Sequence, residues 1–403
     1  MATSLCKDKE KTTGSPKENK GNKPGKSLKD QEQVCKSAPA EGASKKGRKP
    51  SASIKEVTGQ EKEQEKEKDY YKVLNSRVYN EGLVNRGDFT LLLDDDMYAH
   101  WAYQGVRSPG GAILYSDQVI ELGLSIRKLF KLPYRQTQGF LRGLMSRLGW
   151  AVPIPNYSTL NRRASALQVE IAEHEDGSSA EHVSMDSTGL KVSGESEWRV
   201  RKYGKSKRRT WRKLHVVMDL STYQIIDVVL TPNSVDDGSV AEQLLEKITP
   251  CTHCSCYADG AYDQERVRIR LYEKGIEQII PPQRGAVVHA EKPHMKERNQ
   301  AIAFIAEDKE KRTQWKQHKD YHQRSRVEVG MFRLKSIFGH KLLSKKMPYQ
   351  ITEVQIAVKL LNLFTRFGMP VSVKIDRQKK QQQQEQKRKI RAQKQQQKQI
   401  AAR

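Results

Sequence analysis

The chain has 403 residues, enough for two or three domains of ordinary size. Its 73 Lys and Arg residues outnumber its 48 Asp and Glu residues, and the formal net charge of +25 favours a polyanionic partner, most simply DNA, over an acidic-surface enzyme. No run approaches the roughly 20 apolar residues of a spanning helix, and the N-terminus lacks the apolar segment of a secretory signal. Five cysteines, an odd number, disfavour a disulfide framework. We therefore expect a cytoplasmic protein without a membrane partner.

Both ends of the chain differ in composition from the rest. Residues 1–69 carry Lys, Glu, Ser, Gly and Pro with almost no large apolar side chain, which predicts a disordered tail. Residues 371–403 are predicted to be a basic Gln/Lys-rich tail that is disordered or forms a fraying helix on a polyanion. Residues 45–50 resemble a minor-groove hook, although plain electrostatic attraction by the tail is the preferred interpretation of this segment. Residues 70–373 keep a net charge of +11, so the folded part is itself basic.

A helical domain is predicted over residues 70–175. Ser116 can cap a helix that ends at Leu132, and a second helix with one apolar stripe fits residues 136–148. After two prolines, a third, short helix is predicted through residue 164, capped by the segment 156–158; it carries Arg162 and Arg163. This order is typical of a helix-turn-helix unit whose last helix reads a major groove, and the alternative is an ordinary helical bundle with a surface arginine pair.

The pattern changes to mixed α/β over residues 176–370. A short strand ending at Asp186 is followed by a β-branched hairpin, and strands then alternate with helices as far as a last helix that begins at Tyr321. A mixed sheet with helices on its faces is the architecture of a ribonuclease-H-like domain. The predicted elements are strands 182–186, 213–219, 223–230, 255–260 and 278–281, and helices 237–248 and 264–274.

The last predicted helix carries a polar face. At about 100° per residue, four side chains fall within an arc of roughly 60°: Tyr321, Arg324, Glu328 and Lys335. Two further acids, Asp186 and Asp259, stand where strands are predicted to end. Three carboxylates gathered at strand ends and on a facing helix could hold two Mg²⁺ ions, which assist in-line phosphodiester displacement.

Other acids and polar clusters in the sequence are alternative candidates for a functional site. Asp94–Asp96 and Asp236–Asp237 are interpreted as helix caps near Met97 and Val240, and Asp219 as the end of a hairpin strand. The segment 251–256 has three cysteines and His253 and invites a zinc hypothesis, but free cysteines leading into a core strand fit the spacing better. Trp211 could stack on a base, but packing on the sheet is the preferred interpretation of its ring, while its basic neighbours, among them Arg208 and Arg209, are expected to meet phosphate.

Taken together, these motifs resemble bacterial insertion-sequence transposases of the DDE type, the IS-four/IS-five type with a Tyr-x2-Arg-x3-Glu-x6-Lys signature. That signature is complete here, with the first Asp in MDSTGLK and the second in YADGAYD. The resemblance runs from about Tyr79 to Pro370, whereas both tails depart from it.

The resemblance implies a Mg²⁺-dependent enzyme, with Mn²⁺ as a possible substitute, in which Asp186, Asp259 and Glu328 are the metal ligands. Tyr321, Arg324 and Lys335 would bind the backbone of the transposon end. The implied activity is phosphodiester hydrolysis at the terminal inverted repeats followed by strand transfer into target DNA, with at least a homodimer assembled on DNA. The alternatives are a transposase-derived DNA-binding protein without catalysis and a metal-dependent nuclease of the same fold.

Overall fold

The computed structural model describes residues 70–93, 96–105, 113–171, 180–192 and 211–375, together with residues 386, 388 and 391. The predicted N-terminal tail, the segment 45–50, Arg208, Arg209 and nearly all of the C-terminal tail lie outside the described residues. None of the described helices is both long and apolar enough to cross a membrane.

The two ends of the described chain meet in a small antiparallel ribbon. Strand β1 (Tyr70–Val73) pairs with β8 (Ser372–Ile375). Asn75 holds the ribbon end, because its Nδ2 donates to the Met369 carbonyl and its Oδ1 accepts from the Val371 amide, both at 2.9 Å. The predictions of helix from residue 70 and of a tail without fold from residue 371 are therefore wrong at these strands. Pairing between segments about 300 residues apart leaves no local signal in the sequence.

The helical region follows the predicted order. After α1 (Ser76–Asn85) and the 3-10 turn η1 (Phe89–Leu92) come α2 (Asp117–Leu129), α3 (Tyr134–Arg147) and α4 (Tyr157–Arg163). Both predicted caps are confirmed: the Ser116 hydroxyl accepts from the Val119 amide at 3.4 Å, and Asn156 Oδ1 accepts from the Ser158 amide at 3.0 Å. The helix expected near Met97 is wrong, since residues 96–100 form turns.

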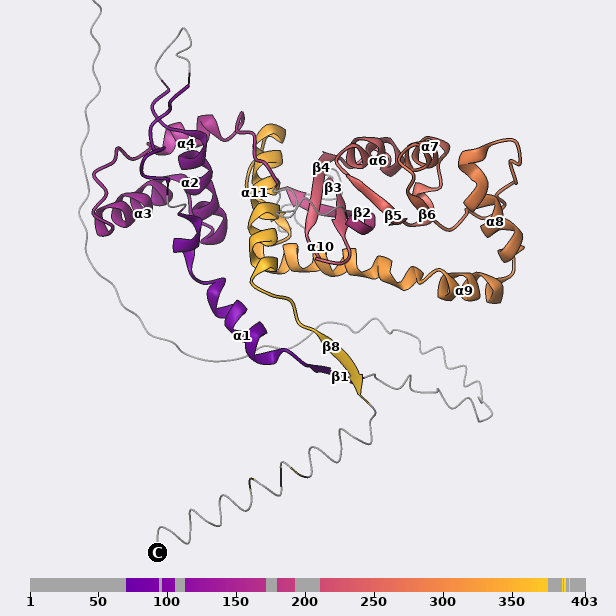
Figure 1. The fold of residues 1–403 in the computed structure, drawn as a ribbon. Helices are drawn as coiled ribbons and strands as arrows, with labels where there is room; N and C mark the ends of the chain where they lie inside the picture. Colours follow the sequence, from indigo (N-terminus) through magenta and orange to yellow (C-terminus); the bar gives the residue numbers. More distant parts are fainter. Residues whose placement is uncertain are drawn as a thin grey trace, which may run out of the picture. The chain divides into compact units, whose positions relative to one another are not determined.

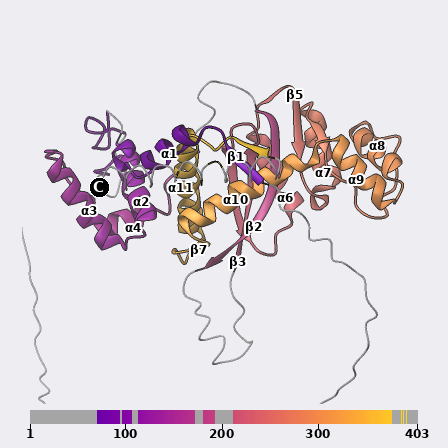
Figure 2. The same ribbon diagram turned by 90° about the horizontal axis from the view of Figure 1, so that it is seen from below.

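A mixed sheet forms the centre of the α/β part. Strands β4 (Ile225–Pro232), β3 (Trp211–Asp219) and β2 (Ala180–Val192) are antiparallel, and β5 (Pro250–Tyr257) and β6 (Glu277–Ile279) continue from β2 in parallel. The order β4-β3-β2-β5-β6 places β2, the first strand of the α/β part, in the middle of the sheet (Figures 1 and 2). A hairpin on one side of this central strand and parallel crossovers on the other is the ribonuclease-H-like arrangement, so the predicted fold class is confirmed.

Helices cover both faces of this sheet. Helices α6 (Asp237–Glu246) and α7 (Glu265–Glu273) pack on one face, and α10 (Ser325–Phe338) and α11 (Met347–Arg366) on the other (Figure 1). Successive side chains of strand β3 point to opposite faces of the sheet and so enter two hydrophobic cores. Val217 packs in the core beneath α6 and α7, and Val216 packs in the core beneath α10 and α11. Gly330 permits close approach on α10, since a Cβ there would stand 2.6 Å from the Met218 sulfur.

Three α-helices of the α/β part were not predicted, two in an insertion and one near its C-terminal end. The 3-10 turn η3 (Pro293–Met295), α8 (Lys296–Ile305) and α9 (Lys309–His318) are inserted between β6 and the 3-10 turn η4 (Tyr321–Arg324). The helix predicted from Tyr321 is the turn η4 followed by α10, which begins at Ser325, and it is not the last helix, because the 20-residue α11 follows it. Helix α9 reads KEKRTQWKQH and has almost no apolar side chain, which explains why its periodicity is weak.

Candidate active site

Asp186 and Asp259 lie side by side because of the strand register. Strands β2 and β5 run in parallel with Ser184 opposite Tyr257. Each aspartate lies two residues beyond these partners, so both occupy the same edge and face of the sheet. The sequence predicted that these two acids gather, but the strand predicted to end at Asp186 is wrong at that end, because β2 continues to Val192 and pairs Asp186 with Val216 of β3.

Backbone amides orient both aspartates. The Ser187 amide donates to Asp186 Oδ1 at 2.8 Å. The Ala261 amide donates to Asp259 Oδ1 at 2.9 Å, which makes Asp259 the cap of the 3-10 turn η2 (Gly260–Tyr262). Both carboxylates therefore have one oxygen fixed by the local chain.

Arg324 brings the third acid to the sheet. Its Nη1 lies 2.8 Å from Asp186 Oδ2, and its Nη2 is paired with Glu328 Oε1. The guanidinium thus bridges a carboxylate of β2 and a carboxylate of α10, two groups far apart in the sequence. The Asp186 side chain is 17% exposed and the Glu328 side chain 54% exposed, so the bridge opens to solvent on the Glu328 side.

The charges at this edge influence one another. Burial raises the pKa of Asp186, and the negative charge of Asp259 raises it further, against the opposing effects of the Ser187 amide and Arg324. Burial would lower the pKa of Arg324, but the carboxylates and Tyr321 outweigh it and raise that pKa. Arg324 therefore stays charged and offsets part of the repulsion between the acids.

The other two residues of the predicted face also contact the sheet close to the two aspartates. The Tyr321 hydroxyl donates to the Ala258 carbonyl at 3.2 Å, and burial raises the pKa of this phenol to about 12. Lys335 Nζ donates to the Thr188 hydroxyl at 2.5 Å, and burial lowers its pKa. The four residues that the helical arc grouped together thus line one edge of the sheet around Asp186 and Asp259.

The donor chemistry of this edge suits a hard divalent cation. Three carboxylates offer the oxygen ligands that Mg²⁺ prefers. Within the described part of the chain, however, no three His, Cys, Asp or Glu side chains are close enough together to hold one metal ion. The Arg324 guanidinium stands between Asp186 and Glu328.

Family comparisons agree with these features. Two family models, each described as a transposase DDE domain, match residues 84–195 and 177–364. The chain belongs to the DDE transposase superfamily. The second match contains all three acids of the edge, and the first contains helices α2 to α4.

Two solved transposase structures are also similar to this DDE transposase. One is the piggyBac transposase synaptic complex with hairpin DNA, with 12% identity, coverage of 71% of this chain and 74% of that chain, and a TM-score of 0.36. The other is the Mos1 transposase paired-end complex with left transposon end, with 11% identity, coverage of 56% and 82%, and a TM-score of 0.19. These alignments are too loose to transfer residue roles.

The predicted DNA-contacting arginines of the transposase have different surroundings. Arg163 donates to the Tyr115 carbonyl at 3.1 Å and pairs with Asp117, so it fastens α4 to the start of α2. Arg162 is exposed on α4. Trp211 packs against the opposite strand, with Lys191 Nζ 5.6 Å from the ring centroid.

The competing acids have structural partners. Asp219 ends β3 as predicted and accepts from the Ser221 amide at 2.8 Å. Asp236 stands at the cap position of α6, but its carboxylate bonds Gln264 and Arg266 instead of the helix amides. In the cysteine cluster, Cys254 and Cys256 are buried in β5.

One buried ionic group next to Asp186 was missed from the sequence. Asp237 Oδ2 lies 2.8 Å from Lys213 Nζ, and its Oδ1 lies 3.1 Å from His215 Nδ1. Burial alone would raise the pKa of Asp237, but His215, Lys213 and the Ser187 hydroxyl lower it to about 2. Because Ser187 follows Asp186, this group supports the strand that carries the first acid. Alternation of polar side chains in the KLHVV strand was the available signal.

Proposed function

We propose that this chain is a transposase that binds the terminal inverted repeats of its element and catalyses phosphodiester hydrolysis and DNA strand transfer. The observation that carries the proposal is the Arg324 bridge, which joins the acid of β2 to the acid of α10 beside Asp259. A structural ion pair would need one carboxylate, whereas three acids at one edge create repulsion without a benefit to the fold. Costly clusters of this kind are typical of functional sites.

The carboxylates of Asp186, Asp259 and Glu328 would hold the divalent cations, two Mg²⁺ ions or Mn²⁺ in their place. Such cations activate an attacking oxygen and stabilise the leaving oxygen of a phosphodiester. In this proposal Arg324 shields the acids from one another before the cations bind, and its guanidinium then meets a DNA phosphate, since Arg binds phosphate through two parallel hydrogen bonds.

Tyr321 and Lys335 would complete the contact with the DNA backbone. Their side chains are fixed by the Ala258 carbonyl and the Thr188 hydroxyl, so a phosphate arriving at this edge meets donors that are already oriented. The basic balance of the folded part supports an extended DNA path. Arg162 on α4, with Arg163, Arg208 and Arg209, would contribute to this path. End pairing implies at least a dimer on DNA, and the site of action would be the nucleoid in the cytoplasm.

The test uses the DNA that flanks the gene. A linear duplex that ends in the flanking inverted repeat is incubated with the full-length protein, Mg²⁺ and a target plasmid, and cleaved and joined products are separated on gels. Glu328→Gln should reduce both reactions at least about a hundredfold while end binding persists, because the change removes a proposed metal ligand worth several kcal/mol of transition-state stabilisation. Glu310→Gln, on the exposed side of α9, is the control and should remain active.

Each outcome separates the candidate functions. Cleavage without joining by the wild-type protein indicates the nuclease alternative. Specific end binding without cleavage or joining indicates a transposase-derived DNA-binding protein. Full activity of Glu328→Gln removes that residue from the proposed site.

A further inference from the structure

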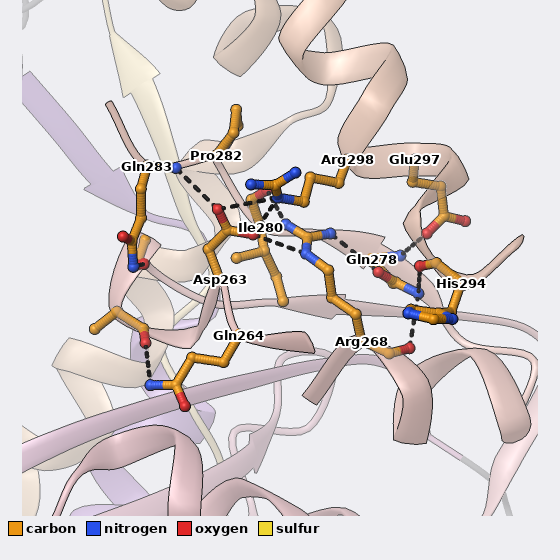
Figure 3. Close-up of polar contacts among 12 residues, drawn as sticks. Asp263, Gln264, Arg268, Gln278, Ile280, Pro282, Gln283, His294, Glu297 and Arg298 are labelled. Carbon is orange, nitrogen blue, oxygen red and sulfur yellow. Dashed lines mark hydrogen bonds and ion pairs between the residues drawn. The ribbon is translucent and has the colours of Figure 1, made fainter. Parts of the chain in front are cut away.

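A second buried polar cluster adjoins the turn that carries Asp259 (Figure 3). Its centre is Asp263, the last residue of the Asp-Gly-Ala-Tyr-Asp turn, whose side chain is 1% exposed. Asp263 Oδ1 lies 2.8 Å from Arg268 Nε and 3.0 Å from Arg298 Nε. Its Oδ2 accepts from the Gln283 amide at 2.9 Å. This carboxylate is therefore fully satisfied despite its burial, as a buried charge requires.

The partners of Asp263 come from three separate elements. Arg268 belongs to α7, Gln283 follows β6, and Arg298 belongs to the inserted helix α8. Gln283 also spans the turn, because its side chain Nε2 donates to the Gly260 carbonyl at 3.2 Å while its amide donates to Asp263. The residue that follows Asp259 and the last residue of the turn are thus held by one glutamine.

The two arginines that bind Asp263 have different further partners. Arg268 reaches inward, donating to Gln278 Oε1 at 3.0 Å and to the Ile280 carbonyl at 3.2 Å, so it links Asp263 to β6. Arg298 reaches outward, and its Nη1 donates to the Val287 carbonyl at 2.7 Å. Arg268 alone is sufficient to neutralise the charge of Asp263. Arg298 in addition attaches the turn to the inserted helix α8, a contact that charge neutralisation does not require.

Helix α8 is itself fixed to the sheet beside this contact. Glu297, the neighbour of Arg298, accepts from the Gln278 backbone amide at 3.0 Å. Consecutive residues of α8 therefore contact β6 and the turn. On the opposite side of Asp259, the Tyr321 hydroxyl holds the Ala258 carbonyl. The backbone on both sides of Asp259 is anchored, whereas its own carboxylate has one amide donor from within the turn.

We propose that Arg298 is a positioning residue for Asp259, through which the inserted helix α8 clamps the Asp259–Asp263 turn. The proposal rests on the proposed function, in which Asp259 is a metal ligand. Without Arg298, Asp263 keeps its pairing with Arg268 and the fold keeps its buried charge balance, but the turn loses its attachment to α8. Asp259 then samples more orientations and binds a divalent cation more weakly.

The test compares Arg298→Met with the wild-type full-length protein. Hydrogen exchange of the amides of residues 260–264 is expected to become about tenfold faster, because the turn opens more often. Mn²⁺ binding, followed by the electron paramagnetic resonance signal of free Mn²⁺, is expected to weaken about tenfold, the lower end of the effect of lost supporting contacts on metal sites. Arg270→Met is the matched control, since Arg270 lies on the exposed side of α7 in an ion pair with Glu273. It should change neither quantity.

The conservative variant Arg298→Lys tests the role further and replaces the methionine variant if that one does not fold. Lysine keeps the charge but cannot donate to Asp263 and the Val287 carbonyl as one planar group, so intermediate exchange and Mn²⁺ binding are expected. Unchanged exchange in both Arg298 variants overturns the proposal, and so does faster exchange with unchanged Mn²⁺ binding. Asp259→Asn distinguishes the two hypotheses: if it binds Mn²⁺ as tightly as wild type, the metal assignment of the proposed function fails, whereas the exchange data still decide whether the clamp exists.

Discussion

Replacing Asp237 by asparagine should destabilise the protein in a pH-dependent manner. Asp237 contacts Lys213 and His215, and its side chain is only 16% exposed. Its pKa falls from 3.8 to about 2 in the folded state. At 1.36 kcal/mol for each pKa unit, this corresponds to a contribution of about 2 kcal/mol to the free energy of unfolding at neutral pH.

The direction of the pH dependence follows from the lowered pKa. A carboxyl whose folded-state pKa lies below its unfolded value stabilises the fold above the unfolded pKa and loses that contribution as the pH falls through the folded pKa. The difference between wild type and Asp237→Asn should therefore be complete above about pH 5, shrink below pH 4 and be nearly gone at pH 2.

Urea denaturation of the full chain at pH 7, 4 and 2.5, followed by circular dichroism, measures this difference. Asp236→Asn is the matched control, because the neighbouring Asp236 side chain is 55% exposed and its ion pair with Arg266 lies in solvent. The control should stay close to wild type at all three values. A loss at pH 7 that is equal in both variants, or one that persists unchanged at pH 2.5, would refute the assignment of the lowered pKa to the buried contacts.

Two further predictions concern buried charges. Lys128 on α2 and Glu353 on α11 form an ion pair at 2.9 Å, with side-chain exposures of 7% and 3%. Lys128→Met should therefore lower the free energy of unfolding by about 3 kcal/mol, because it leaves the buried charge of Glu353 unpaired. Adding Glu353→Gln should recover part of that loss, as measured by urea titration. If adding Glu353→Gln recovers none of the lost stability, the unpaired charge of Glu353 is not the cause of the loss. Asp186→Asn should unfold at the same or a higher temperature than wild type at pH 7, because the raised pKa of Asp186 means that its ionised form is disfavoured in the fold as the pH rises through that pKa. Scanning calorimetry at pH 7 and pH 3 tests this, and a lower unfolding temperature at pH 7 contradicts it.

The arrangement of the edge acids was predictable from local signals. Asp259 follows the end of the apolar strand β5 and Asp186 lies within the apolar strand β2, and the helical period alone grouped Arg324 with Glu328. What periodicity could not supply was the direct contact between Arg324 and Asp186, which depends on how α10 lies across the sheet.

The parts that escaped prediction depend on distant partners. Strand β1 pairs with β8 at the other end of the described chain, and α9 is held by the single buried Trp315 on an otherwise polar helix. Asp237 was interpreted as a cap because a pair of acids before a helix is the usual capping signal, whereas its partners Lys213 and His215 come from the neighbouring strand β3. Asp263 was visible in the turn motif, but its two arginines come from separate helices.

The central claim is that Asp186, Asp259 and Glu328 work together as ligands of divalent cations. Anomalous scattering from Mn²⁺ in crystals of the protein bound to its element-end DNA tests it most directly. We predict manganese peaks in contact with all three carboxylates, with the Arg324 guanidinium moved from between Asp186 and Glu328 onto a DNA phosphate. Peaks only at other sites, with the Arg324 bridge intact beside bound DNA, would contradict the account.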